Sequence, residues 1–192
     1  SIGVMWSVSY VPTQDGPAHL YIASVLRLMA AGPGSVFADF FQTNWNYQPN
    51  LFAYAALYTL LGYVPPEIAE KLLISLYLIS LPLAAAFTAW RGGGRPALMA
   101  LLTLPVALSH TFFMGFYNYG FSQVLFLIGL GLWFGLAERP TAGRHAALGL
   151  AALLAFFCHI FGAAALLFVA ACGTVWRIAA DGRSQDAGTL TL

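Results

Sequence analysis

The chain has 192 residues, of which 60% are hydrophobic and only 8% are charged, and its mean hydropathy is +0.77. Soluble domains carry about 25% charged residues, so this composition excludes an ordinary soluble protein and indicates a membrane protein. The formal net charge is +1, and the few Lys and Arg residues form no basic patch, which excludes nucleic acid as a partner.

Apolar runs that approach the length of a membrane span lie between residues 72 and 136. A helix needs roughly 20 residues to cross about 30 Å of hydrocarbon, and the runs 72–90, 97–116 and 121–136 come close to this length. They are rich in Leu, Ala, Gly and Phe, and they lack the alternation of barrel strands. We therefore expect an all-α fold, a polytopic transmembrane helical bundle that lies in the lipid bilayer.

The N-terminal part of the chain is predicted to lie mostly outside the bilayer. Residues 1–9 are apolar but give only about half of a crossing, so we expect them to be the end of a first span and the chain to be a fragment of a longer protein. Residues 10–66 follow as a large first extracytoplasmic loop. Its segments 18–31 and 50–63 are helical in composition, but at about 14 residues each they are typical of short interfacial or core helices.

The arginine residues predict the orientation of the bundle. The loops 90–95 and 137–145 carry four of the eight basic residues, and short basic loops collect on the cytoplasmic side. Two spans, 96–116 and 119–137, then run out and back between these loops. A span over 67–90 must begin outside, which places the preceding loop on the outer face.

The transmembrane region is expected to cover residues 67–176, with 177–192 as a cytoplasmic tail or loop. Within it, the segment 146–176 has two interpretations. A single tilted span would put the arginines that follow it outside, against the charge rule. A broken helix or tight hairpin that turns near residues 158–162 would return them to the cytoplasm, and the charge rule favours this second interpretation.

The stretch "VPTQDGPAHL" contains the first acidic residue of the chain, Asp15. With Gly16 and Pro17 behind it, Asp15 is well placed to cap the helix predicted over 18–31, because a carboxylate satisfies free backbone N–H groups and proline fits a first turn. A carboxylate at the outer membrane surface can also act as a general base toward a hydroxyl group. The two roles are compatible.

Three further polar residues of the outer loop are candidates for substrate contacts. His19 and Arg27 share one face of the predicted helix, where Arg27 would bind a phosphate or extend to the lipid headgroups. Asp39 is the next carboxylate along the loop, and it is either a helper of Asp15 or a loop and cap residue.

Residues 44–50 alternate amide and aromatic side chains. Amides hydrogen-bond sugar hydroxyls and aromatic faces stack on sugar rings, so Trp45 and Asn46 are candidate sugar contacts. The alternative is an ordinary interfacial turn.

Polar residues inside the apolar region are the last group of candidates. At membrane depth such groups face a cavity or a neighbouring helix, so Asn118 and His159 are predicted either to contact substrate or to hydrogen-bond another helix. At the start of the 67–90 span, Glu67 and Lys71 predict an (i, i+4) ion pair, and Glu70 is interpreted as a structural acid of the first turn.

The segments "QDGPAHLYIASVL", "PEIAEKLLISLYLISLPLAAAF" and "GFYNYGFSQVLFLIGLGLW", together with the long first outer loop, resemble bacterial GT-C-type integral membrane glycosyltransferases. More narrowly, they resemble GT-C-like membrane proteins in which an Asp-Gly-Pro-x-His segment follows the first span. The resemblance implies a multi-pass protein of the bacterial inner membrane. It also implies transfer of a sugar from a polyprenyl-phosphate-linked donor to a hydroxyl acceptor on the outer face.

The resemblance also implies roles for particular residues. In that family the acid just after the first span is the catalytic or metal-associated residue, and the match here is Asp15. Many members carry a second adjacent acid, whereas Gln14 and Gly16 flank Asp15 in this chain. This departure argues against a divalent metal, and no other cofactor is expected. Arg27 or another cation would stabilise the leaving phosphate.

Two alternatives belong to other functional classes. A transporter or a lipid- or solute-binding protein without catalysis would use polar groups near the midplane, namely His110, His159 and the break at 158–162. A structural subunit would have no ligand and no cavity near Asp15.

Overall fold

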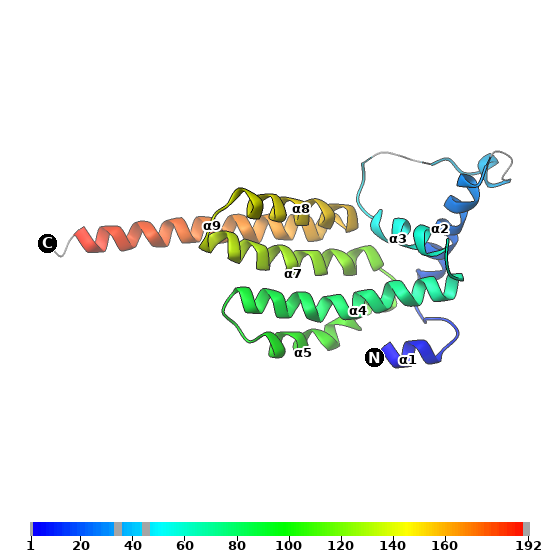
Figure 1. The fold of residues 1–192 in the computed structure, drawn as a ribbon, viewed down its shortest axis with the longest axis horizontal. Coiled ribbons are helices and arrows are strands. Elements are labelled where there is room, and N and C mark those ends of the chain that lie inside the picture. Colours follow the sequence, from blue (N-terminus) through cyan, green and yellow to red (C-terminus); the bar gives the residue numbers. More distant parts are fainter. Residues whose placement is uncertain (1, 33–35, 44–46, 190–192) are drawn as a thin grey trace.

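The computed structural model describes residues 2–32, 36–43 and 47–189. Within these residues the fold is all-helical, with 79% of the chain in helices and no strands, as the composition predicts. The elements form an elongated bundle, shown in Figure 1, with the N-terminal helices grouped at one end.

In the part of the chain that the structure describes, three helices are long and apolar enough to cross a membrane: α4 (Pro66–Arg91), α7 (Tyr117–Glu138) and residues Ile160–Ala180 of α9 (Ile160–Thr189). Two shorter apolar helices, α5 (Pro96–Ala107) and α8 (Ala142–Cys158), complete the bundle. Helix α7 is central, because it packs against α4, α8 and α9, while α5 packs along α4.

Glycine residues allow α7 to approach its neighbours closely. A Cβ atom at Gly129 would be 2.4 Å from a methyl group of Leu166 on α9, and one at Gly131 would be 2.5 Å from the Phe87 ring on α4. Small residues at such contacts are the usual device for packing helices in membranes.

The expected span over 96–116 is wrong, because the helix is interrupted. Helix α5 ends at Ala107, and a separate short helix, α6 (His110–Phe113), follows. Pro105 lies inside α5, and proline removes one backbone hydrogen bond and crowds the carbonyl four residues earlier. Ser109 then has extended dihedral angles (φ −72°, ψ 173°) and begins the new helix.

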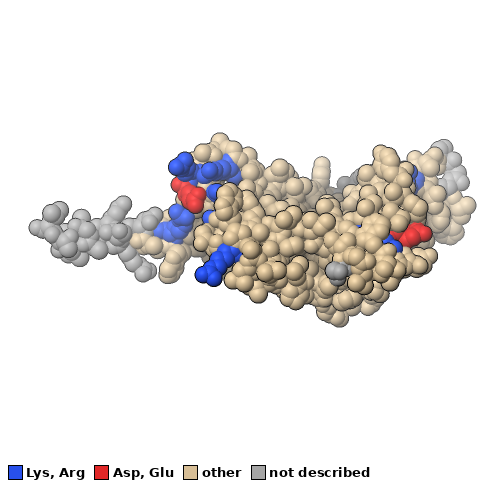
Figure 2. Space-filling view, turned by 60° about the horizontal axis from the view of Figure 1, so that its bottom comes forward, with Lys and Arg blue, Asp and Glu red and all other residues tan. Residues whose placement is uncertain are grey.

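The hairpin interpretation of segment 146–176 is confirmed. Helix α8 ends at Cys158, His159 is extended (φ −163°, ψ 135°), and α9 runs back beside α8. The connections α4–α5 and α7–α8 therefore lie at the same end as the later part of α9. Figure 2 shows basic residues gathered at this end and a middle band without charges on the visible face.

The arginine end is held together by contacts to backbone and one carboxylate. Arg91 pairs with Glu138 at 3.4 Å, which is the one ion pair found within the described residues. Arg144 donates to the Gly135 carbonyl at 2.5 Å, and Arg177 donates to the Ala137 carbonyl at 2.9 Å. The predicted grouping of these loops at one end is therefore correct, whereas their cytoplasmic location stays a prediction.

The opposite end carries α1 (Ile2–Ser7), α2 (Gly16–Ala30), the short 3-10 helix η1 (Val36–Asp39) and α3 (Phe52–Leu60). Helices α2 and α3 pack together and confirm the two short helices predicted in the first loop.

The predicted ion pair between Glu67 and Lys71 is wrong. The end of α1 and the chain that follows it pass over the start of α4, where Lys71 is buried and donates to the Val8 carbonyl at 2.5 Å. Its ammonium group also lies 5.7 Å from the centre of the Trp6 ring. The covering segment, rather than the neighbouring turn of α4, supplies the partners of Lys71.

Candidate functional site at the start of α2

The segment 13–16 is bound through its backbone to the joint between α6 and α7. The amide of Gln14 donates to the Phe113 carbonyl at 2.9 Å, and the amide of Asp15 donates to the Met114 carbonyl at 3.1 Å. Gly115 makes this approach feasible, because its φ is +81° and a Cβ atom there would be 3.0 Å from the amides of Asp15 and Gly16. An L-residue at 115 would be both strained and crowded.

Asp15 stands at the N-cap position of α2, but its carboxylate makes no capping hydrogen bond. Its dihedral angles (φ −94°, ψ −4°) are helical, whereas side-chain caps need an extended residue. The expected cap is therefore absent, and the half-buried carboxylate is not engaged by the start of its own helix. The main chain, rather than the side chain, fixes Asp15.

His19 lies one turn further along α2 and faces the same joint. Its Nε2 atom is 3.1 Å from the Gly115 carbonyl, and since a carbonyl only accepts, Nε2 carries the proton. The other ring nitrogen, Nδ1, is buried and has no hydrogen-bond partner within the described residues. Burial lowers the pKa of His19, against smaller opposing effects of the Gly115 bond and the Asp15 charge. The imidazole is thus neutral at pH 7, with a free acceptor at Nδ1.

Tyr54 of α3 completes a group of three that we call the Asp15 site: Asp15, His19 and Tyr54. The rings of His19 and Tyr54 are 5.2 Å apart between centres. Burial raises the pKa of Tyr54, and the nearby Asp15 carboxylate raises it further. A carboxylate, an imidazole acceptor and a phenol donor thus lie together at the end of the bundle that carries the N-terminal helices.

Beneath this site lies a second group, the buried polar layer, formed by Thr13, Glu70 and Tyr117. The Tyr117 hydroxyl donates to Glu70 Oε1 at 2.5 Å, and the Thr13 and Tyr117 hydroxyl oxygens are 2.8 Å apart. The exposed fractions of the three residues are 7%, 3% and 6%, in chain order. The Tyr117 ring also packs against His19, with 5.2 Å between the ring centres, so the two groups are contiguous.

Arg27 does not join Asp15. Twelve residues separate them along α2, which corresponds to about 18 Å at 1.5 Å per residue. The Arg27 guanidinium donates to the Tyr58 carbonyl at 3.2 Å and lies 5.5 Å from the centre of the Tyr58 ring. Asp39 is exposed in η1, and the candidate sugar contacts Trp45 and Asn46 lie outside the described residues.

Asn118 and His159 hydrogen-bond neighbouring backbone. Asn118 of α7 accepts from the Ala53 amide at 2.8 Å and donates to the Asn50 carbonyl at 3.1 Å, so it holds the start of α3. His159 Nδ1 accepts from the Phe161 amide at 3.3 Å in the turn before α9, and its ring packs against Tyr119. Asn118 thus makes a hydrogen bond to another helix, which the sequence left open, whereas the hydrogen bond of His159 is local and only its ring contacts another helix.

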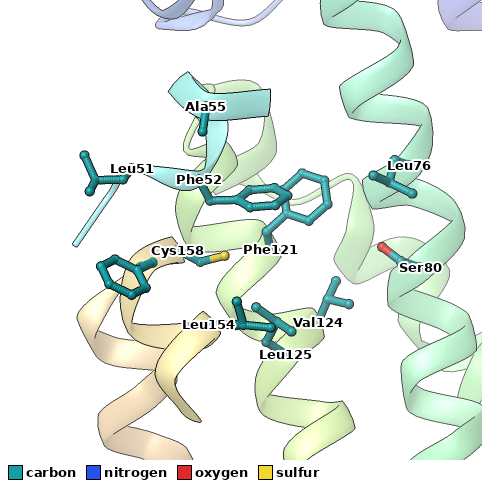
Figure 3. Close-up of a pocket in the computed structure, with 11 residues that line it drawn as sticks. Leu51, Phe52, Ala55, Leu76, Ser80, Phe121, Val124, Leu125, Leu154 and Cys158 are labelled. Carbon is teal, nitrogen blue, oxygen red and sulfur yellow. The ribbon is translucent and has the colours of Figure 1, made fainter. Parts of the chain in front are cut away.

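An apolar groove of about 470 Å³ lies between α3, α4, α7 and α8. Its lining is almost entirely hydrocarbon and aromatic, as Figure 3 shows, and the Cys158 side chain lies at its α8 side. Leu76 contributes from α4, Phe121 from α7, and Ala55 from α3. The groove therefore begins directly under α3, one of the two helices that carry the Asp15 site.

Two side chains of the Asp15 site are potential metal ligands, because carboxylate oxygens and imidazole nitrogens bind divalent cations. Across the described part of the chain, however, no three His, Cys, Asp or Glu side chains lie close enough to hold an ion. Among the described residues, the Asp15 site thus offers no more than two protein ligands to an ion, Asp15 and His19.

The sequence singles out Asp15 and His19, and the structure brings these two together. The sequence predicts only a structural role for Glu70 and does not single out Tyr54, Thr13 or Tyr117 for the site. The spacing along the chain offers no signal for these contacts, because Thr13 and Tyr117 are 104 positions apart.

No protein-family model, no curated protein and no solved structure matches the chain.

Proposed function

We propose that the chain forms the acceptor-activating part of a GT-C-type glycosyltransferase on the outer face of the bacterial inner membrane, with Asp15 as the general base. The observation that carries this proposal is the state of Asp15. Its backbone is bound to the α6–α7 joint, yet its carboxylate makes no capping bond. A fixed but unengaged carboxylate is what proton removal from a hydroxyl requires.

In the proposed reaction, an acceptor hydroxyl oxygen forms a bond to the anomeric carbon of the donor sugar. The bond from that carbon to the phosphate oxygen breaks, and polyprenyl phosphate leaves with the electron pair. The hydroxyl proton passes to Asp15. His19 Nδ1 and the Tyr54 hydroxyl supply an acceptor and a donor for the sugar or acceptor hydroxyls, because Nδ1 is unpaired within the described residues.

The apolar groove supports a lipid-linked donor. It lies against α4 and α7, two of the helices suited to cross a membrane, so bilayer hydrocarbon can reach it. A polyprenyl chain in this groove would bring the phosphate-linked sugar toward α3 and the Asp15 site. Burial of the polyprenyl chain would then provide most of the binding free energy, while the polar side chains of the Asp15 site would orient the sugar.

The test uses the full-length protein in native membranes and a radiolabelled polyprenyl-phosphate-linked hexose. Release of polyprenyl phosphate from this donor is measured for the wild type, Asp15→Asn and Glu67→Gln. We expect Asp15→Asn to lower the rate at least about 100-fold, which is the usual contribution of a general base. Glu67→Gln removes a carboxylate at the same end and should leave the rate unchanged.

Equal rates in the wild type and Asp15→Asn would contradict the proposal. Binding or movement of a polar solute without release of polyprenyl phosphate would favour the transporter. That alternative relies on polar groups near the midplane. His159, however, follows the end of α8, where the Phe157 carbonyl binds the Leu51 amide before α3, and His110 begins α6, whose Phe113 carbonyl binds the Gln14 amide before α2.

A further inference from the structure

We infer that Glu70 is the positioning residue of the Asp15 site and that, through Tyr117 and Thr13, it holds the segment 13–16 in place. Its effect on sugar transfer rests on the function proposed above, whereas its effect on the segment does not. Nothing in the sequence pattern assigns Glu70 this role, because an acid in the first turns of a helix is ordinary.

The hydrogen bonds run from Glu70 directly into the segment. Tyr117 of α7 donates to Glu70 Oε1 at 2.5 Å, and its hydroxyl oxygen lies 2.8 Å from that of Thr13. Thr13 also approaches Glu70 Oε1 at 3.4 Å. Thr13 is two residues before Asp15, so the buried polar layer ties both α4 and α7 to the chain that carries the carboxylate.

The segment is enclosed from two sides. On one side Gly115 contacts the amides of Asp15 and Gly16, where a Cβ atom at residue 115 would be 3.0 Å from both. On the other side a Cβ atom at Gly16 would be 2.1 Å from Glu70 Oε1 and 2.6 Å from the Tyr117 hydroxyl. A displacement of Glu70 therefore opens one side of the enclosure around Gly16, the residue that follows Asp15.

Packing alone does not require a carboxylate at residue 70. Its neighbours on the buried face of α4, Leu73 and Ile74, are almost fully buried apolar residues, and an apolar side chain of similar size avoids the desolvation cost of a carboxylate. Lys71 does not offset that cost through a direct ion pair, because it donates to the Val8 carbonyl instead. The two hydroxyls of the layer are the hydrogen-bond partners of Glu70 within the described residues.

Two substitutions distinguish a positioning role from a catalytic one. Glu70→Gln keeps an oxygen that accepts from Tyr117 and removes the ability to take up a proton, whereas Glu70→Leu removes the acceptor. A positioning residue tolerates the first change and not the second. A proton-carrying residue tolerates neither.

The experiment measures backbone hydrogen exchange of the peptide covering residues 11–20 in the full-length protein in lipid nanodiscs. We expect Glu70→Leu to speed exchange of this peptide roughly tenfold without changing peptides from the α7–α8 connection. Glu70→Gln and the control Glu67→Gln should exchange as the wild type does. If Glu70→Leu fails to insert, Thr13→Val breaks the same contacts from the segment side and should give the same acceleration.

Unchanged exchange in Glu70→Leu or, where that variant fails, in Thr13→Val would overturn the inference. In the release assay, Glu70→Gln should keep the rate and pH profile of the wild type while Glu70→Leu loses most of the rate. Loss in both variants would overturn the positioning role in favour of proton transfer by Glu70. Faster exchange in Glu70→Leu, together with a wild type that releases no polyprenyl phosphate, would support the inference and contradict the proposed function.

Discussion

Gly16 lies so close to Glu70 that a Cβ atom on residue 16 would be 2.1 Å from Glu70 Oε1. Packing therefore requires a glycine after Asp15, because a side chain at residue 16 would overlap the atoms of the buried polar layer. The sequence alone explains it only as a helix-start residue.

The first prediction concerns this contact. Gly16→Ala should destabilise the protein by about 1–3 kcal/mol, the usual cost of overpacking a buried position, because the contacting atoms belong to short, hydrogen-bonded groups. Thermal unfolding in detergent measures the effect. Gly143→Ala is the matched control, since a Cβ atom there meets nothing within 4 Å, and a destabilisation equal to that of Gly143→Ala would contradict the packing argument.

The second prediction concerns pH. Burial lowers the pKa of His19 in the folded protein, so the unfolded chain binds the proton more readily. The contribution of neutral His19 to the free energy of unfolding is therefore fully present above the pKa of the unfolded chain, about 6.5. It decreases as the pH drops from there toward the pKa of the folded protein. Unfolding temperatures between pH 8 and pH 5 should show this decrease, and His19→Gln should reduce it. His110→Gln changes an exposed histidine, and an equal reduction in that variant would rule out His19 as the source.

The third prediction concerns the groove. Ala55→Trp places a large side chain at its α3 wall and should raise the KM for the polyprenyl-linked donor about tenfold while kcat changes little, because the chain contributes equally to ground-state and transition-state binding. Thr59→Trp, on an exposed position of the same helix, is the control. A fall in kcat with unchanged KM would show that the donor chain does not occupy the groove.

The fourth prediction concerns orientation. A membrane-impermeant maleimide should label Tyr63→Cys in intact cells and Gly143→Cys only after the membrane is opened. Both positions are exposed. Tyr63 precedes α4 and Gly143 lies at the start of α8, and these two helix starts are at opposite ends of the bundle. The basic loops at the second end belong in the cytoplasm under the positive-inside rule. The reverse labelling pattern would place Asp15 in the cytoplasm and contradict the proposed function.

Much of the fold could be predicted from the sequence, because long apolar runs and basic loops are local signals. They located α4 and α7, the two short helices of the first loop, and the turn at His159. The same signals predicted one continuous span over 96–116, whereas α5 ends at Ala107. Hydropathy does not register the helix-breaking effect of Pro105 inside an apolar run. The Lys71 side chain also binds the Val8 carbonyl, which lies 63 positions away in the sequence. No local sequence pattern reveals such a contact.

The candidate site was predictable only in part for the same reason. Asp15 is conspicuous as an acid beside glycine and proline, and His19 follows on the same helix. Tyr54 is one of several similar tyrosines, and only the packing of α3 on α2 distinguishes it. Glu70 is inconspicuous because its partners come from two other parts of the chain.

The break between α6 and α7 has an effect beyond the course of the chain. In an unbroken helix, the carbonyl groups of Phe113, Met114 and Gly115 would each bind an amide one turn ahead. Because the helix stops and restarts, these three carbonyls instead receive Gln14, Asp15 and His19. The break between α6 and α7, where Gly115 has a φ of +81°, thus leaves main-chain acceptors that bind the segment 13–16 and the His19 ring.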